Sequence, residues 1–416
     1  MSGKSELMLF DDAVPQVVVQ SASFVDIQPQ TALSENTSNV EFVVHGSESE
    51  YLDLNDTLLY VKVKVTDSAG KNLADASRVC PANYFMNALF SDVTLALNDT
   101  IIEGGNQLYA YKATIESIFG LNEDTRRLQL RSLGFIADDD DRRVDLIEKS
   151  KDCELMGALR LNFFSQPKYL LPGVTVRLTL HRAKDTFALI HGAGNPVIHM
   201  KAARLYVRRV RTAPSVIRGH ELGLAKKNAI YPYTRGQVIT YSVAQGSYSH
   251  SRDDIFSSSM MPKFVIVGMV LSEAYNGDTL ESDPFEFKHF NMQSIALYRD
   301  GQALPYREAY EPNFGANIYV KEYVKSIVHS TQHLNTNMNN GISLDDFAHG
   351  KYCFFTFNLA PDFDMNQCQL PRDGNLRLEV KFRTALPKSI NMVVYGMFDA
   401  QIQITKDRRI VCTHVH

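Results

Sequence analysis

The sequence predicts an all-β chain built from two similar domains in tandem, and three observations lead to this fold class. Apolar and polar residues alternate in many short segments, as they do in strands that bury one face. Turn-forming pairs such as Pro172-Gly173 and Asp373-Gly374 separate these segments. Several segments recur after an offset of about 200 residues, as a repeated domain requires.

Strands with one solvent-exposed face are expected where the alternation is regular. Between Leu59 and Val65, valines occupy every second position from Val61 onward and lysines stand between them. The same pattern is found in residues 176–180, 376–382 and 401–405. Two other segments, Phe264–Val270 and Cys353–Leu359, are apolar on both sides, which indicates strands covered on both faces.

Helical periodicity is scarce. Apolar residues recur at spacings of three and four around Leu108–Phe119 and around Ile318–His329, so we expect a helix in each stretch. The two stretches occupy equivalent places in the two halves of the chain. They therefore belong to the same repeated unit.

Four features recur in one order and at one offset. The pairs are Leu95–Asp99 with Ile295–Asp300, the expected aromatic strands Leu161–Phe164 and Phe354–Phe357, Leu171–Leu180 with Leu370–Val380, and Ala203–Val207 with Met397–Ile402. The simplest explanation is duplication of one all-β domain. Each copy has the size of an eight-stranded jelly roll with an inserted helix, so the predicted fold is two tandem eight-stranded jelly-roll β-sandwiches with short helical insertions.

The domain limits follow from where the alternation stops. Before Asp26 the chain carries two apolar clusters, Leu7–Phe10 and Val17–Val19, around an acidic turn and Pro15, as an arm would. Between Thr212 and Gly236 the alternation is lost and turn formers accumulate, which is typical of a connector. The expected order is an arm (1–25), a first jelly roll (26–212), a linker (213–235) and a second jelly roll (236–416).

Composition limits the classes of partner. The 416 residues are 44% apolar and 22% charged and carry a net charge of −4, so there is no global attraction to nucleic acid or to an anionic membrane. A local basic stretch could contact phosphates, although the solvent-exposed face of a strand followed by a polar linker explains it better. It comprises Arg204, Arg208, Arg209, Arg211, Arg218, Lys226 and Lys227.

The five cysteines indicate a reducing compartment. They are odd in number, widely spaced and free of C-x-x-C pairs, which argues against a disulfide scaffold and a zinc site. Residues 1–6 lack the apolar core of a signal peptide, and the apolar run Phe264–Leu271 is too short to span a bilayer. We expect a soluble protein made in the cytosol, with free thiols at Cys80, Cys153, Cys353, Cys368 and Cys412.

No catalytic, cofactor-binding or metal site is predicted. The acidic run Asp138–Asp141 lacks the ligand spacing of an EF-hand and is interpreted as a solvated loop. The cluster Gly192-Ala193-Gly194 lacks the third glycine of a nucleotide-binding loop. Neither a Cys/His hydrolase pair nor the two-histidine-plus-carboxylate set of a cupin-type enzyme can be assembled. The histidines considered are His181, His191, His199, His414 and His416.

The chain resembles the double jelly-roll major capsid proteins of Polinton (Maverick) elements and adintoviruses, in the wider lineage of adenovirus hexon and tailless phage capsids. The resemblance spans nearly the whole chain. The residues that carry it are Leu9–Asp12, Ser38–Phe42, Tyr51–Leu54 leading to Leu58–Val61, Ala110–Glu116, and Asn162–Phe164 before Pro172-Gly173.

This resemblance implies a structural protein and not an enzyme. Its members form homotrimers, pseudo-hexagonal capsomers that contact neighbouring capsomers in an icosahedral shell around double-stranded DNA. Penton or minor capsid proteins and non-specific contacts with packaged DNA are the further expected partners. The protein would reside in the virion after assembly in the host nucleus or cytoplasm. The alternative is a cytosolic tandem jelly-roll binding or scaffold module, lectin-like or a domesticated capsid protein, although the absence of Trp disfavours a lectin.

Overall fold

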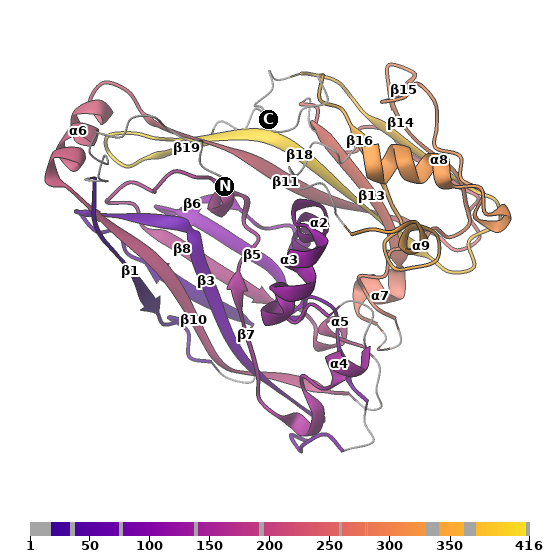
Figure 1. Ribbon diagram of the computed structural model, residues 1–416, viewed down its shortest axis with the longest axis horizontal. Coiled ribbons are helices and arrows are strands. Elements are labelled where there is room, and N and C mark those ends of the chain that lie inside the picture. The colour runs from indigo at the N-terminus through magenta and orange to yellow at the C-terminus, as the bar shows by residue number, and fades with distance from the viewer. Residues whose placement is uncertain are drawn as a thin grey trace, which may run out of the picture.

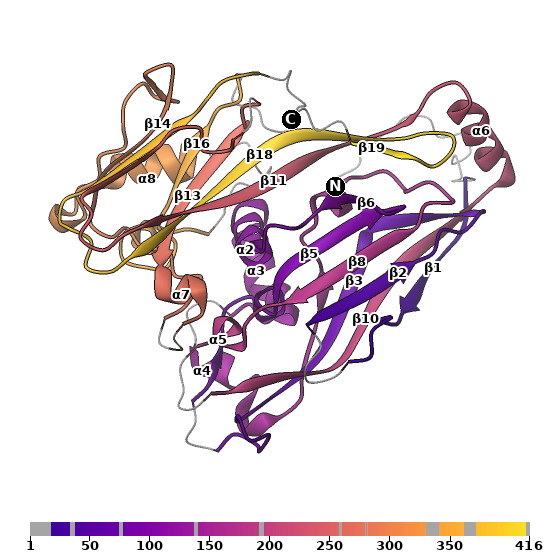
Figure 2. The same cartoon turned by 180° about the vertical axis from the view of Figure 1, so that it is seen from behind.

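The computed structural model shows two β-sandwiches side by side, with helix α2 (Tyr109–Gly120) between them (Figure 1). Seen from behind, the same arrangement places α6 (Pro214–Leu224) and α8 (Val320–Tyr323) at opposite ends of the molecule (Figure 2). The structure describes residues 18–33, 38–74, 78–136, 140–190, 195–257, 260–278, 280, 282–329, 341–361 and 372–412.

The first sandwich consists of two antiparallel four-stranded sheets, of order β1-β10-β3-β7 and β2-β8-β5-β6. A short pair, β4 with β9, lies outside them. The strands are β1 (Val19–Ile27), β2 (Asn39–Val44), β3 (Glu50–Thr66), β4 (Cys80–Pro81), β5 (Phe90–Leu97), β6 (Thr100–Glu103), β7 (Cys153–Ala158), β8 (Val176–Arg182), β9 (Leu189–Ile190) and β10 (Val197–Thr212).

The second sandwich repeats this topology. Its sheets have the order β11-β18-β13-β16 and β12-β17-β14-β15, so each strand of one sandwich has a counterpart of the same rank in the other. The tandem repeat and the jelly-roll fold are therefore confirmed. The strands are β11 (Ala229–Val243), β12 (Ser249–Arg252), β13 (Phe264–Leu271), β14 (Met292–Arg299), β15 (Gln302–Leu304), β16 (Phe354–Asn358), β17 (Arg377–Phe382), β18 (Ile390–Ile404) and β19 (Ile410–Cys412), the last pairing with β18.

The predicted alternation in β3 is confirmed by burial. Val61, Val63 and Val65 point into the core and are fully buried. The intervening lysines lie on the outer face, where Lys62 pairs with Asp152 at 3.2 Å. One sheet face is therefore packed and the other is solvated, as in an antiparallel sandwich.

Strands β13 and β16 are buried on both faces, also as predicted. Their inner face packs in the second sandwich, and α2 of the first sandwich reaches their outer side. The ring of Phe119 in α2 meets that of Phe354 in β16 at 5.4 Å between centroids. Each aromatic ring buried here contributes about 1.5–3 kcal/mol, so α2 joins the two sandwiches through apolar burial.

Both predicted helices are present. Residues 109–120 form α2, and residues 320–329 form α8, which continues as a π-helix, η5 (Val324–His329). The short helices are α1 (Phe85–Ala88), α3 (Glu123–Leu128), α4 (Asp140–Val144), α5 (Asp185–Ala188), α7 (Ser272–Asn276), α9 (Leu344–Ala348) and the 3₁₀ turns η1 (Leu130–Leu133), η2 (Glu148–Ser150), η3 (Asn162–Ser165) and η4 (Phe314–Ala316). In the described part of the chain, no helix is long and apolar enough to cross a membrane.

Some expected elements differ. Leu161–Phe164 was predicted to be an aromatic strand but forms the 3₁₀ turn η3, because the backbone N–H of Asn162 donates to Glu103 Oε2 (2.8 Å) rather than to a strand. Residues 19–25, expected in the arm, pair with β10 as part of strand β1; this edge strand is largely exposed and so shows no alternation. The stretch expected to be a linker contains α6 and the start of β11. The four domain limits stay a prediction.

Candidate functional site

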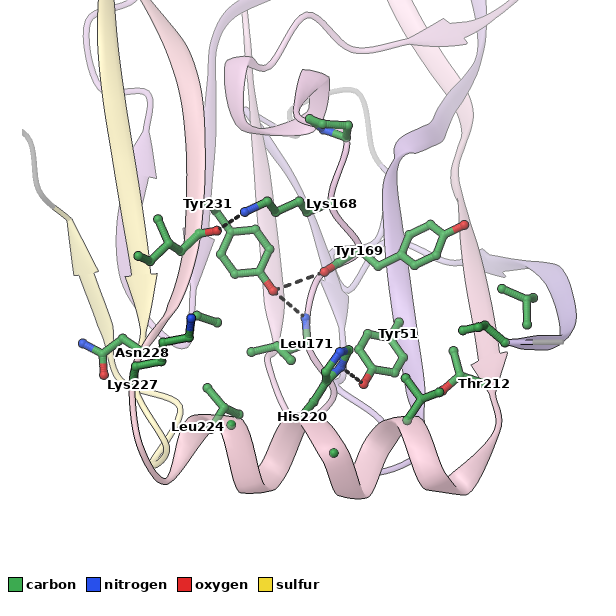
Figure 3. Close-up of a pocket in the computed structure, with 18 residues that line it drawn as sticks. Tyr51, Lys168, Tyr169, Leu171, Thr212, His220, Leu224, Lys227, Asn228 and Tyr231 are labelled. Atoms are coloured by element: carbon green, nitrogen blue, oxygen red, sulfur yellow. Dashed lines mark hydrogen bonds between the residues drawn. The ribbon is translucent and has the colours of Figure 1, made fainter. Parts of the chain in front are cut away.

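A pocket of about 520 Å³ lies above α6, where the two sandwiches meet (Figure 3). Helix α6 forms its floor in this view. The walls come from the beginning of β1, from β3, from the loop before β8 and from the beginning of β11. Apolar side chains such as Val19, Leu171, Val216 and Leu224 line most of it. Its size is within the range of sites that enclose a small ligand or a few side chains.

Tyrosine hydroxyls fix the walls of this pocket. Tyr51 Oη lies 2.6 Å from His220 Nδ1, which links β3 to α6. Tyr231 Oη donates to the carbonyl of Tyr169 (3.2 Å) and accepts from the backbone N–H of Leu171 (3.2 Å), which links β11 to the first sandwich. Burial raises the pKa of Tyr231, so this hydroxyl stays protonated and keeps its donor role.

Apart from three tyrosines, the ionisable residues that line the pocket are basic. They are Lys168, His220 and Lys227, and no Asp or Glu is found among the described residues that line it. Lys168 Nζ donates to the carbonyl of Ile230 at 2.7 Å. Glu221, the carboxylate next along α6, pairs instead with Arg408 in the turn after β18. A group with carboxylates at its ends would fit this rim electrostatically.

Helix α6 carries little packing of its own. Leu224 is its buried residue, and two pocket-lining glycines, Gly219 and Gly223, stand four residues apart on it. A Cβ added at either glycine would meet no atom within 4 Å. Glycine inside a helix costs about 1 kcal/mol relative to alanine, so these positions keep space open at the expense of helix stability.

A buried charged cluster lies at the junction of the sandwiches. Lys112 of α2 forms ion pairs with Glu103 and, at 3.8 Å, with Glu116. Burial alone would lower the pKa of Lys112, but the two carboxylates outweigh it and raise that pKa. Burial also raises the pKa of Glu116, opposed by Lys112 and reinforced by Glu103. Two carboxylates thus share one buried cation.

This cluster connects directly to the second sandwich. Tyr395 Oη of β18 donates to Glu116 Oε1 at 3.1 Å, and Asn162 Nδ2 donates to the same oxygen at 2.9 Å. The backbone N–H of Gly236 in β11 donates to Asn162 Oδ1 at 3.0 Å. A Cβ at Gly236 would come within 2.6 Å of both Glu116 and Tyr395 side-chain oxygens, so the approach requires glycine.

The outer side of α8 and η5 has an apolar stripe, formed by Val320, Val324 and Val328. These valines are 53%, 43% and 50% exposed. The inner side is anchored by Ser326, which accepts from the N–H of Thr356 at 2.8 Å. Three exposed valines at a spacing of four on one helix face indicate a contact surface rather than scattered exposure.

The predicted histidines and acidic run do not come together as a site. His181 Nδ1 lies 2.9 Å from Asn39 Oδ1, and His199 Nε2 lies 2.7 Å from Thr66 Oγ1, so both have local partners. Across the described residues, no group of three or more His, Cys, Asp or Glu could hold a metal ion. His191, Gly192-Ala193-Gly194, His414, His416, Asp138 and Asp139 lie outside the described residues, and Asp141 pairs with Arg78.

Part of the basic stretch is paired with carboxylates. Arg204 pairs with Asp26 (3.0 Å) and Arg208 with Asp53 (3.1 Å), both on the outer face of the β1-β10-β3-β7 sheet. Arg209 pairs with Glu50 at 3.3 Å. The interpretation as the solvent-exposed face of a strand is confirmed for Arg204 and Arg208, whereas the side chain of Arg209 is only 17% exposed.

The described cysteines are free thiols, as predicted. Cys80, Cys153 and Cys353 are buried and Cys412 is half-buried. Burial raises the pKa of Cys153 to about 11, so its thiol is protonated and unreactive at neutral pH. Cys368 lies outside the described residues.

The sequence alone did not identify two of these surfaces, the valine stripe and the pocket above α6. The helical pattern of 318–329 is visible in the sequence, but periodicity cannot show which face of the helix a neighbouring sheet covers, so it does not identify the exposed valines. For the pocket above α6 the available signal was the pair Gly219 and Gly223, four apart in a stretch interpreted as linker.

A protein of a nematode is similar to this chain over most of its length. No protein-family model matches the chain. An uncharacterized protein of Caenorhabditis elegans, F54H12.2, is 25% identical over 377 residues, which cover 86% of this chain and 89% of that protein.

Solved structures match over nearly the full length. A chain of the Sputnik virophage structure has a TM-score of 0.67 at 11% identity, covering 99% of this chain and 92% of its own. The PBCV-1 virus capsid matches at 0.61 and 12%, covering 98% and 100%. The mavirus major capsid protein matches at 0.57 and 11%, covering 99% and 93%. The fold is therefore that of the viral double jelly-roll capsid proteins.

Proposed function

We propose that the protein is a capsid protein, a structural protein and not an enzyme, that assembles as a homotrimer into pseudo-hexagonal capsomers. The observation that carries the proposal is the full-length match of both jelly rolls to viral capsid chains. Neighbouring capsomers are its main partners, in an icosahedral shell around double-stranded DNA. Penton or minor capsid proteins and local contacts with DNA complete the proposed set, and the Polinton or adintovirus type is the proposed family.

The internal repeat suggests how the trimer closes. Helix α2 lies between β6 and β7 in the first sandwich, and the second sandwich covers its other side. Helix α8 with η5 has the same place in the second sandwich, but its valine stripe is exposed. A first sandwich from a second copy would cover the stripe in an equivalent way. Such a head-to-tail contact closes into a ring when the rotation permits, and three copies present six jelly rolls.

The native mass tests this proposal. Light scattering of the purified protein should give three times 46.9 kDa, about 140 kDa. Negative-stain images of the same fraction should show triangular or hexagonal particles. A monomer that never associates would contradict the proposal and favour a tandem jelly-roll binding module.

One substitution tests the proposed contact surface. Val324→Asp places a charge in the apolar stripe, and desolvating a carboxylate at an interface is costly. We expect the native mass to fall from that of a trimer to that of a monomer. The monomer of the variant should melt at the same temperature as the monomer of the natural protein, because the side chain of Val324 is already exposed.

The control for this substitution is Ile101→Asp. Ile101 is 65% exposed on β6, in the β2-β8-β5-β6 sheet. Helix α2 contacts β11 and β18 of the second sandwich, so the proposed contact uses their counterparts β1 and β10 and leaves the sheet of Ile101 free. This variant should stay trimeric. A trimer that survives Val324→Asp would remove the stripe from the contact.

A domesticated or genome-carried capsid protein is the second candidate. The observation that favours it is that the relative in sequence is a protein of a nematode rather than of a virus. Both candidates predict trimers. Electron microscopy of cells that produce the protein distinguishes them, because closed shells that contain DNA, with the protein in virions, are expected of the first candidate alone.

A further inference from the structure

We propose that the pocket above α6 is a docking site for the N-terminal segment of the same chain, with Leu7–Phe10 as the inserted apolar residues. The described chain begins at Val18, and Val18 and Val19 themselves line the pocket. Seventeen residues therefore precede the rim. The site and its occupant do not depend on whether the chain forms shells.

Chain length allows this insertion. Phe10 and Val18 are eight residues apart, a span of up to about 28 Å when extended. This exceeds the width of a pocket of about 520 Å³, so residues 11–17 can turn back over the rim. A segment attached at the rim also has an effective concentration in the millimolar range, which free ligands rarely match.

The chemistry of the two parts is complementary. Leu7, Met8, Leu9 and Phe10 are apolar, like most of the pocket lining. Carboxylates flank these residues at Glu6, Asp11 and Asp12, and the basic residues of the lining are Lys168, His220 and Lys227. The apolar residues would fill the pocket, and the carboxylates would face the basic rim.

The construction of α6 supports an occupant. Most helical stability in proteins comes from tertiary packing, and α6 buries one residue, Leu224. Gly219 and Gly223 weaken the helix further and leave open space above it. Side chains inserted over these glycines would supply the packing that α6 lacks among the described residues.

Cross-linking tests the occupant. Leu9→Cys combined with Gly223→Cys should form a disulfide under mild oxidation, and the product should run as a monomer on a denaturing gel. Each single variant is the control for native thiols. A dimer band would place the segment of a second copy in the pocket, and no new bond would remove the segment from it; either result overturns the proposal.

A peptide of residues 5–12 gives an independent measurement. Fluorescence anisotropy should show that the labelled peptide binds a chain that starts at Val18 and binds the full chain at least tenfold more weakly, because the full chain already fills its pocket. Equal binding to both, or to neither, would contradict self-occupancy.

Filling the pocket provides the matched test. Gly219→Leu with Gly223→Leu in the shortened chain puts side chains into space that holds no atom within 4 Å of the new Cβ atoms, and leucine is the better helix former, so folding is retained. Peptide binding should fall at least tenfold. Leu222→Ala, at an exposed position of α6, should leave it unchanged. Undiminished binding to the filled variant would overturn the proposal.

Discussion

At the residue scale, Glu116 lies at the centre of the hydrogen bonds and ion pairs that join the two sandwiches. Its carboxylate accepts from Asn162 and Tyr395 and shares Lys112 with Glu103. Burial raises its pKa above the ordinary value of 4.5. The folded state therefore holds this proton more tightly than the unfolded state. The contribution of Glu116 to the free energy of unfolding is present in full below pH 4.5. It is lost as the pH rises through the pKa that Glu116 has in the folded state.

Glu116→Gln tests the direction of this effect. The variant removes the titration, so the free energy of unfolding of the natural protein relative to the variant should fall as pH rises above 4.5. The slope cannot exceed about 1.4 kcal/mol per pH unit, because one proton is involved. Urea unfolding at several pH values between 4 and 8 measures it. Parallel curves for the two proteins would show that Glu116 titrates normally.

At the element scale, the strands were predictable and the junction was not. Alternation in residues 59–65 identifies β3 because one of its faces meets water, and the turns at 172–173 and 373–374 mark the strands that follow them. Residues 161–164 look like a strand because Phe163 and Phe164 are buried, yet η3 buries them in a turn. Local sequence does not record the hydrogen bonds that hold this turn, which Asn162 donates to Glu103 and to Glu116 of α2 and accepts from Gly236 of β11.

Asn162→Ala should therefore affect more than η3. It leaves the backbone N–H of Gly236 and one carboxylate oxygen of Glu116 without this partner. Glu116 Oε1 keeps its hydrogen bond from Tyr395, but an unsatisfied buried N–H costs about 1–3 kcal/mol, so we expect a loss of about 1–3 kcal/mol in guanidinium unfolding. Asn276→Ala, at an exposed asparagine of α7, should change stability by less than about 0.5 kcal/mol. Equal effects of the two substitutions would contradict the role of Asn162.

At the scale of the whole molecule, duplication explains why so much of the fold was readable. Because the strand order occurs twice, the sequence pattern of each strand is seen a second time in its counterpart, as in β5 with β14 and β8 with β17. The duplication also makes the differences informative. Where α2 is buried between sandwiches, α8 with η5 exposes valines, and only the three-dimensional arrangement separates the two.

The N-terminal segment should matter for shells and not for trimers. Strand β1 begins at Val19 and pairs with β10 over its length, so a truncation through Asp26 would remove an edge strand and expose β10.

A chain that starts at Val18 keeps that strand and loses residues 1–17. The native mass of this shortened chain should stay at the trimer value, because the valine stripe of α8 and η5 lies at the opposite end of the molecule from α6 (Figure 1). Loss of residues 1–17 would leave the apolar lining of the pocket above α6 uncovered, so we expect the number of closed shells in negative-stain images to fall at least tenfold. Loss of trimers on truncation would instead place the segment in the contact within the capsomer, and normal shells would show that it has no role in assembly.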